Sequence, residues 1–361
     1  MKKKGLIAVA ALWCCLAAAA WFLPSRDISE AERRKLTQFP KLNAGEIISG
    51  RFMSEFEKYS QDQFPLRDLF RQIKARFHYN VLLQKDNNGI YFADGYACEL
   101  GDPVNDWSVD RVISLFDKIY TEQIQPGGSK VYLCPVPDKG YFLGNTYGYP
   151  STDYEALFGA VRDGMPWAQY VEITGSLELT DYYRTDTHWR QECILPAAQV
   201  LCDAMGVSPL SDYREEVITK PFRGVYCGQS ALPLEPEEIR VLTSDLLDGC
   251  TVENLETGKT TKVYDMDKLD SRDLYDVYLS GATAFLTIDN PAAATDRELV
   301  VFRDSFGSSM IPLLLTDYRK VTVVDLRYIA SDVLPSVLEF HGQDVLLLYS
   351  ALILNNSASL K

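Results

Sequence analysis

Histidine is scarce in this chain, and the cysteine patterns that bind metals are missing. The 361 residues include only three histidines, His78, His188 and His341. Of the eight cysteines, two lie in an apolar N-terminal run, and the others are scattered without a C-x-x-C pair or zinc-site spacing to histidine. The sequence therefore argues against a zinc site and indicates no metal or cofactor. The cysteine pattern permits disulfides but does not demand them.

Positive charge is in the minority. Lysine and arginine number 36 against 50 aspartate and glutamate residues, which gives a net charge of −14. This excess of acid disfavours nucleic acids and anionic lipid surfaces as partners, because both repel a negative protein. Aromatic residues make up 12% of the chain, and 21 of them are tyrosines. Their amphipathic faces are compatible with stacking on an extracellular carbohydrate.

Charged residues are absent from the run Gly5 to Leu23, which follows three lysines. At about 1.5 Å per helical residue, such a run just spans a hydrocarbon core of about 30 Å. The lysines predict a cytoplasmic N-terminus and an exported remainder, anchored outside the cytoplasmic membrane. We therefore expect a signal anchor in residues 1–23. A cleaved signal peptide is the alternative, because Ala18-x-Ala20 fits a signal peptidase site.

The rest of the sequence predicts one large α/β domain behind a tether. Residues 24–80 read as a polar tether and N-terminal helices. From residue 81 to 361, strands and helices alternate, which predicts a parallel sheet with right-handed crossovers and flanking helices. Residues 207–295 interrupt this order with short β-prone runs between Asp, Gly and Pro turns. We expect them to form an irregular β-rich insertion and not a separate domain.

Hydrophobic periodicity and turn residues give the elements of the α/β part. The expected helices cover residues 107–125, 153–163, 192–205, 307–318 and 331–340, and the expected strands cover residues 130–136, 170–174, 299–302, 321–326 and 344–349.

Two short segments carry the residue types that a serine nucleophile needs. Asp186 and His188 lie two positions apart, and Ser305 lies at a turn from an apolar strand into a helix. An imidazole can take the proton of a serine, and a carboxylate can fix the tautomer of that imidazole. If the three residues form a catalytic triad, the Ser305 hydroxyl should lie within about 4 Å of a ring nitrogen of His188, with Asp186 at the other.

Simple structural roles are the alternatives for these residues. Serine and aspartate are favoured helix caps, so Ser305 and Asp186 could each be a cap. His78, in a helical run, and His341, in a loop before the last strand, read as structural. Lys139 follows the strand 130–136, where it could line a site or be a solvated loop residue.

An acyl transfer site also needs donors for the oxyanion. The backbone N–H of Ser305 and its neighbours, at the start of a helix, are expected to supply them. A side-chain donor is expected too, and the sequence leaves the choice among Tyr183, Tyr349 and Asn355 open. Trp189, which follows His188, is a further candidate for the substrate site.

These segments resemble the DHHW protein family of bacteria, which is similar in turn to SGNH-hydrolase-like proteins that O-acetylate alginate and other exported polysaccharides. The resemblance starts at about residue 44 and departs from the family pattern at one position, where Thr187 replaces the first histidine of Asp-His-His-Trp. That form occurs in the alginate acetyltransferase branch and leaves His188 as the base candidate. The matching segments are residues 136–139, 186–189, 303–309 with Tyr318, 324–328 and 344–356.

The resemblance implies an SGNH-like, flavodoxin-type core with Ser305 as nucleophile, His188 as base and Asp186 as its partner. It also implies a membrane-anchored serine O-acyltransferase, an O-acetyltransferase, that acts on a cell-surface or secreted polysaccharide. An exported domain has no access to cytoplasmic acetyl-CoA, so a membrane-bound partner that exports acyl groups is expected. The alternatives are a carbohydrate esterase and a non-catalytic carbohydrate-binding or scaffold protein of an exopolysaccharide system.

Overall fold

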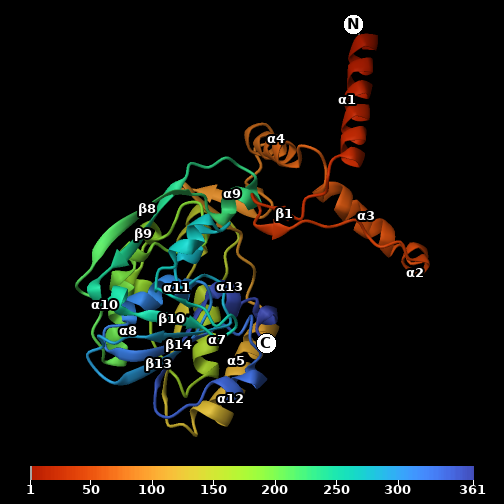
Figure 1. Cartoon of the computed structure of the whole chain (residues 1–361). Helices are drawn as coiled ribbons and strands as arrows, with labels where there is room; N and C mark the ends of the chain where they lie inside the picture. The colour runs from red at the N-terminus through yellow and green to blue at the C-terminus, as the bar shows by residue number, and fades with distance from the viewer. Residues whose placement is uncertain (1) are drawn as a thin grey trace. The chain divides into compact units, whose positions relative to one another are not determined.

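The computed structural model describes residues 2–361 and divides them into two compact units (Figure 1). The first unit contains the chain up to Ile90 together with Val225–Leu234. The second unit contains Tyr91–Gly224 and Glu235–Lys361.

The first unit is mainly helical. Its helices are α1 (Lys2–Phe22), α2 (Ala44–Ile48), α3 (Arg51–Asp62), α4 (Arg67–Asn80) and α9 (Val225–Ser230), and its short strands are β1 (Ile28–Ser29), β2 (Arg34–Lys35) and β3 (Asp86–Asn87). Among the helices that the structure describes, none combines the length and the apolar character that crossing a membrane requires. The structure thus gives no support to the anchor expected over residues 1–23.

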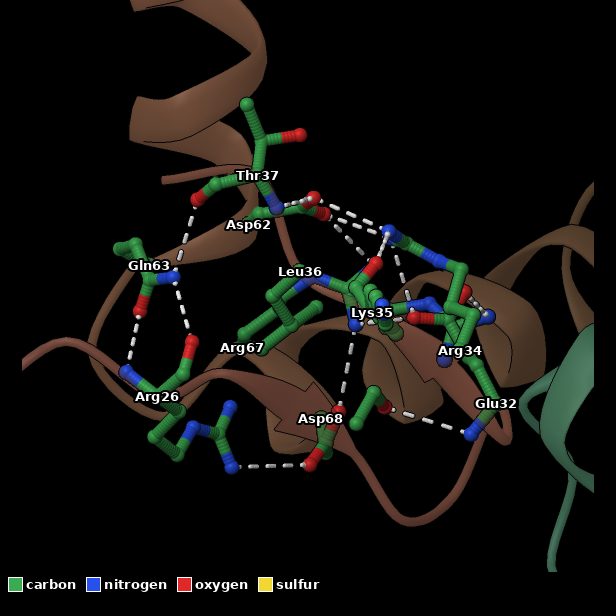
Figure 2. Close-up of polar contacts among 12 residues, drawn as sticks. Arg26, Glu32, Arg34, Lys35, Leu36, Thr37, Asp62, Gln63, Arg67 and Asp68 are labelled. Carbon is green, nitrogen blue, oxygen red and sulfur yellow. Dashed lines mark hydrogen bonds and ion pairs between the residues drawn. The ribbon is translucent and has the colours of Figure 1, made fainter. Parts of the chain in front are cut away.

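Polar contacts hold the segment before α2 against the end of α3 (Figure 2). The Asp62 carboxylate accepts hydrogen bonds from both terminal nitrogens of Arg34 and, at 2.9 Å, from the backbone N–H of Thr37. The Gln63 amide accepts from the N–H of Arg26 at 2.9 Å and donates to the carbonyls of Arg26 and Thr37 at 2.8 and 3.1 Å. The side chains of Asp62 and Gln63 therefore attach residues 26–37 to the C-terminal end of α3.

The Asp62 contacts make the first unit sensitive to acid. The hydrogen bonds from Arg34 hold the pKa of the Asp62 carboxyl well below its usual value. Because the folded-state pKa is lowered, the stabilisation is complete above the unfolded pKa of about 3.9 and is lost as the pH falls below it. We expect amide exchange in α3 to accelerate in this range. Asp62→Asn should cost about 1–3 kcal/mol at neutral pH and flatten the acid dependence.

Hydrogen exchange, corrected for the intrinsic rates at each pH, measures this effect. Glu57→Gln, on the exposed face of the same helix, is the matched control and should leave the profile unchanged. An Asp62→Asn protein with the wild-type acid dependence would show that the carboxylate does not carry it.

An eight-stranded sheet forms the centre of the second unit. The strand order is β11-β10-β12-β14-β13-β15-β6-β7, and β14, β13, β15, β6 and β7 run parallel to one another. The strands are β6 (Lys130–Val136), β7 (Gln169–Tyr170), β10 (Thr251–Asn254), β11 (Thr260–Thr261), β12 (Phe285–Asp289), β13 (Arg297–Arg303), β14 (Tyr318–Val324) and β15 (Asp344–Ser350). The α/β class and the parallel pairing agree with the expectation from the sequence.

Alternate residues of the parallel strands enter two separate cores, because side chains of a strand point to opposite faces of a sheet. Val300 and Phe302 of β13 pack on one face with α5 (Asp106–Ile119) and α7 (Tyr154–Gly164). Leu299 and Val301 pack on the other face with α8 (Leu195–Met205). The second unit therefore has a helix–sheet–helix arrangement that buries β13 from both sides.

The β-rich segment 207–295 is more closely joined to the sheet than the sequence suggested. Its strands β10, β11 and β12 extend the central sheet, with β12 pairing antiparallel to β14. A separate hairpin is formed by β8 (Arg214–Phe222) and β9 (Glu237–Thr243). Between the two hairpin strands, Val225–Leu234 belong to the first unit. This pairing could not be predicted from the sequence, because such short strands show no hydrophobic periodicity and their partners are distant in the chain.

Three expected elements are shorter than predicted. The helix expected over 307–318 is α11 (Phe306–Met310) followed by a 3₁₀ turn over Ile311–Leu314. Pro312 explains the change, because it has no N–H to continue the α-helical hydrogen bonds. The helix expected over 331–340 is reduced to a 3₁₀ turn and α12 (Leu334–Val337), and the strand expected over 170–174 to β7. Among the described residues, none of the eight cysteines forms a disulfide.

Candidate active site

Ser305 lies just beyond the carboxyl end of β13, at the start of α11. The preceding residue fixes the turn. One carboxylate oxygen of Asp304 accepts from the N–H of Phe306 at 3.0 Å, and the other accepts from the N–H of Ser350 at 2.8 Å. Asp304 thus ties the ends of β13 and β15 together and orients Ser305 at the edge where parallel sheets form their sites.

Asp186 and His188 lie in a tight loop between β7 and α8. An antiparallel bridge joins Tyr182 to Trp189 at the base of the loop, and the N–H of Tyr183 donates to the carbonyl of His188 at 3.1 Å. The Asp186 carboxylate accepts from the backbone N–H of His188 at 3.1 Å. The carboxylate therefore faces the residue two positions later, as in an Asx turn.

The structure brings Asp186, His188 and Ser305 together, although 117 positions separate His188 from Ser305 in the sequence. The Nε2 of His188 lies 2.7 Å from the Oγ of Ser305, and its Nδ1 lies 2.6 Å from the carboxylate of Asp186. Both distances are shorter than the limit of about 4 Å expected for a triad. Asp186 is fully buried, His188 is 7% exposed and Ser305 is partly open to solvent. An Nδ1–H donated to Asp186 leaves Nε2 free to accept the serine proton.

Ser305 is not a side-chain cap of α11. Its hydroxyl makes no capping hydrogen bond, and the Asp304 carboxylate accepts the N–H of Phe306 instead. The alternative interpretation of Ser305 from the sequence, as a capping serine, is therefore wrong. The hydroxyl is directed to His188.

The imidazole of His188 is held between two aromatic rings. Tyr275 stacks on it with ring centroids 3.9 Å apart and an angle of 8° between the planes, and Phe306 packs at 5.2 Å. The hydroxyls of Tyr275 and Ser309 lie 2.7 Å apart, and the indole N–H of Trp189 donates to Ser309 at 2.9 Å. Trp189 is thus a fully buried support of the turn at α11 and not a substrate-facing residue.

Two charged side chains, the fully buried Lys139 and the partly buried Glu237, hold the backbone that leads to Asp186. Glu237 accepts from the N–H groups of Arg184 and Thr185, each at 2.7 Å. The Lys139 ammonium donates to the carbonyls of Tyr183, at 2.8 Å, and Ala97, at 2.5 Å. Burial lowers the pKa of Lys139 to about 8. Lys139 is therefore not a solvated loop residue. Its ammonium group holds the backbone of the loop that carries Asp186 and His188.

The three proposed oxyanion side chains lie in packed surroundings, and in the described part of the chain the buried hydroxyls of Tyr183 and Tyr349 have no hydrogen-bond partner. Tyr183 is fully buried with its ring 4.9 Å from that of Phe222, and Tyr349 is 1% exposed with its ring 5.6 Å from that of Phe116. Asn355 accepts from the N–H of Asn105 at 2.8 Å and donates to the carbonyl of Pro103 at 3.1 Å. These contacts give all three residues roles in packing and loop structure.

The backbone around Ser305 offers fewer oxyanion donors than the sequence suggested. The N–H groups of Phe306 and Gly307 are bonded to Asp304, and that of Ser308 to Ser305. Within the part of the chain that the structure describes, the N–H of Ser305 makes no hydrogen bond. It is the donor that stays available to a developing oxyanion.

A strained loop contacts the end of β13, the strand that precedes Ser305. Leu279, Ser280 and Gly281 have φ values of 50°, 59° and 74°. These values lie in the left-handed region, which is unfavourable for residues other than glycine. The guanidinium of Arg303 donates to the carbonyl of Gly281 at 2.9 Å and pairs with Asp325 at 3.8 Å, with both side chains fully buried. Arg303 thus connects the strand that leads to Ser305 with the segment that carries Tyr275.

Comparison with solved structures identifies this architecture. A DHHW family protein from Eubacterium siraeum is similar to the chain with a TM-score of 0.60, 17% identity, and coverage of 76% of this chain and 94% of the other. The chain has the fold of that DHHW family protein. Bacillus cereus PatB1 with a sulfonyl adduct is similar with a TM-score of 0.58, 16% identity, and coverage of 73% and 95%.

A weaker likeness links the chain to the O-acetyltransferase domain of Pseudomonas putida AlgJ, with a TM-score of 0.45, 16% identity, and coverage of 74% and 92%. No protein-family profile matches the sequence, and no curated protein matches it at a significant level. The likeness to the DHHW family protein and to PatB1 is thus one of fold.

Gly224 supports the triad by having no side chain. Its N–H donates to the hydroxyl of Thr185 at 3.0 Å, and an added Cβ would overlap the Thr185 carbonyl and the N–H of Asp186. Gly224→Ala should therefore displace Asp186 while leaving every triad side chain present. We expect the low-field proton resonance of the His188 Nδ1–H to shift or broaden, with a loss of roughly 1–3 kcal/mol in stability.

Proton NMR and thermal unfolding measure these two effects. Gly175→Ala is the control, because nothing lies within 4 Å of a Cβ added there. A folded Gly224→Ala protein with an unchanged low-field resonance would contradict the proposed support.

Proposed function

We propose that this protein is a serine-dependent O-acyltransferase, specifically an O-acetyltransferase of an exported polysaccharide. The observation that carries the proposal is the hydrogen-bonded series Asp186–His188–Ser305, with distances of 2.6 and 2.7 Å. A fully buried carboxylate, a nearly buried imidazole and a partly exposed hydroxyl are what nucleophilic acyl transfer uses.

In the first half of the proposed reaction, the Ser305 Oγ attacks the carbonyl carbon of an acyl donor. His188 Nε2 takes the serine proton, and the N–H of Ser305 binds the oxyanion of the tetrahedral intermediate. When the intermediate collapses, the bond from the carbonyl to the donor breaks, and His188 gives its proton to the leaving group. Ser305 is then acylated, and His188 is neutral again.

In the second half, a sugar hydroxyl attacks the acyl-serine. His188 takes the proton of that hydroxyl, a second tetrahedral intermediate forms, and its collapse returns the proton to Ser305 and releases the O-acylated sugar. Water in place of the sugar gives the esterase alternative. The sequence resemblance to alginate O-acetylating proteins, including the Asp-Thr-His-Trp form, favours the transferase.

A polar cavity supports a saccharide acceptor. It has a volume of about 400 Å³ and lies beside the triad loop, lined by Tyr96, Arg184, Arg190 and Glu237 among others, while Asp186, His188 and Ser305 are not part of its lining. An aromatic ring among planar charged groups suits a sugar, which offers both apolar ring faces and hydroxyls. A non-catalytic saccharide-binding protein would use such a cavity equally well, so chemistry at Ser305 distinguishes the two functions.

Covalent labelling tests the nucleophile. Ser305→Ala should abolish reaction with a fluorophosphonate or a sulfonyl fluoride and lower the hydrolysis of p-nitrophenyl acetate by about four orders of magnitude or more. His188→Ala should cause a similar loss, because members of a triad act as a unit. Asp186→Asn should also be severe, through the wrong imidazole tautomer.

The control is Ser308→Ala, which removes a hydroxyl from the same helix and should retain labelling. Ser305→Ala should change stability by less than about 0.5 kcal/mol, because the side chain does not cap α11. A wild-type chain that is folded but inert towards all three reagents would favour the non-catalytic binding function.

Tyr275 is a positioning residue in this proposal. Its ring lies flat on the imidazole, so Tyr275→Leu should let His188 rotate away from Ser305 and lower the rate of labelling by roughly 100-fold. Tyr275→Phe keeps the stacked ring and loses only the hydroxyl contact to Ser309, so it should restore most of the rate. Equal losses in the two variants would show that the hydroxyl, and not the ring, is needed.

Export and membrane attachment complete the proposal. Three N-terminal lysines followed by the uncharged run Gly5 to Leu23 predict a domain held outside the cytoplasmic membrane. Such a domain needs a membrane-bound partner that delivers acyl groups. We expect the full-length chain to fractionate with membranes and to be digested by protease added to intact cells. A protease-resistant chain in the cytosol would exclude this location.

A further inference from the structure

The negative charge of the chain is unevenly distributed. In the unit that ends at Ile90, lysine and arginine outnumber aspartate and glutamate, and residues 225–234 carry no charge. The excess of acid that gives the chain its net charge of −14 therefore lies entirely in the second unit. The expectation that the protein avoids anionic lipid surfaces follows from the total charge, which differs in sign from the charge of the first unit.

Helix α4 presents an apolar stripe to solvent. Residues spaced three or four positions apart lie on one face of a helix. The stripe consists of Leu66 at the N-cap and Leu69, Phe70, Ile73 and Phe77, with exposures of 64%, 50%, 41%, 53% and 50%. Side chains of this size are exposed singly on many proteins, but a continuous stripe of them marks an interaction surface.

The opposite face of α4 attaches the helix to its own unit. Ala75 is fully buried, and the hydroxyl of Tyr79 donates to the carbonyl of Ile90 at 2.7 Å. Arg71 pairs with Glu32 at 3.0 Å and donates to the carbonyl of Gly228 at 2.8 Å. The helix is therefore fixed by one side, and its apolar stripe is left on the other.

Basic side chains flank the stripe. Lys74 lies next to Ile73 and Phe77 in the helical projection, and Arg76 lies on the other side of the same residues. Both are exposed. Long basic side chains in this position can extend past an apolar surface and keep their charges at the level of lipid phosphates.

Helix α3 shows how an aromatic stripe is covered within the same unit. Its Phe52, Phe56 and Tyr59 have a partner in Phe39, whose ring lies 6.4, 5.9 and 5.3 Å from theirs. In the α4 stripe, Phe70 has such a contact with the ring of Phe64 at 5.5 Å. Leu69, Ile73 and Phe77 of the stripe remain at least half exposed and are available to an external partner.

We propose that α4 binds the surface of an anionic lipid bilayer, with its apolar stripe in the interfacial layer and Lys74 and Arg76 at the lipid phosphates. Its 14 residues extend for only about 21 Å, so α4 would lie in the plane of the bilayer and not span it. The basic flanks favour an anionic lipid surface over the same face of a second copy of this chain, because Lys74 and Arg76 would meet like charges there.

The apolar surface continues past the end of the helix. Val81, Leu82 and Leu83 are 61%, 50% and 78% exposed and follow α4 directly. A lipid-bound α4 would bring them to the same interface. Attachment through α4 is independent of the chemistry at Ser305, so either proposal can fail without the other.

Hydrogen exchange of the full-length chain tests the proposal, because it reports on α4 separately from α1. We expect peptides that cover residues 66–83 to exchange about tenfold more slowly with vesicles of equal parts phosphatidylcholine and phosphatidylglycerol than with phosphatidylcholine alone. High salt should reduce the difference, because it screens Lys74 and Arg76.

Two variants separate the contributions. Ile73→Ser/Phe77→Ser should remove the lipid-dependent protection, and both positions are exposed, so the fold should persist. Lys74→Glu/Arg76→Glu should remove the preference for phosphatidylglycerol. The matched control is Val217→Ser/Leu255→Ser, which removes two exposed apolar side chains from the second unit, at 44% and 51% exposure, and should change nothing.

Three outcomes would overturn the proposal. The first is equal exchange of residues 66–83 with and without either vesicle. The second is protection that persists in the Ile73→Ser/Phe77→Ser protein. The third is protection that increases with protein concentration in the absence of lipid, which would assign the stripe to a second copy of the chain.

Discussion

The geometry at Ser305 depends on the hydrogen bonds that hold one stretch of backbone, from Tyr183 to Thr185. Glu237 binds the N–H groups of this stretch, and Lys139 binds its carbonyls. Both side chains are largely buried, so their charges interact with the backbone in a medium of low dielectric, where such contacts are strong. Because the stretch leads directly to Asp186, its position sets that of the carboxylate and of His188.

The second unit combines a rigid platform with a less regular wall. The platform is the parallel sheet, whose central strand β13 is buried on both faces and delivers Ser305. The wall comes from residues 207–295, which supply Tyr275 against the imidazole and Glu237 beneath the loop. Arg303 joins the two parts through its contacts with Gly281 and Asp325.

Much of the fold and the three triad positions could be predicted from the sequence. Buried parallel strands such as 130–136 and 344–350 are continuous apolar runs, and their bounds follow from composition. His188 was identifiable because only three histidines are present and one of them has an acid two residues before it.

The remaining parts of the site had no comparable signal. Tyr275 is one of 21 tyrosines, and Glu237 one of many acids, so nothing in their local sequence points to a role. The pairing of β12 with β14 joins segments that are distant in the chain, and α11 was overestimated because Pro312 was taken to lie within a helix. The oxyanion candidates Tyr183, Tyr349 and Asn355 were chosen by residue type, which does not indicate where a side chain points.

The sheet positions Ser305, and residues 207–295 supply Tyr275. The two parts of the site can therefore change separately during evolution. Ser305 follows β13, a strand that cannot vary without disrupting two cores. The ring that contacts the imidazole sits in a short 3₁₀ turn, Leu274–Val277, followed by residues with left-handed φ values. Substitutions or insertions in that segment can alter which molecules approach His188, including water, while the sheet stays the same. In the proposed reaction, the preference between transfer and hydrolysis can thus change through this segment alone, with Ser305 kept constant.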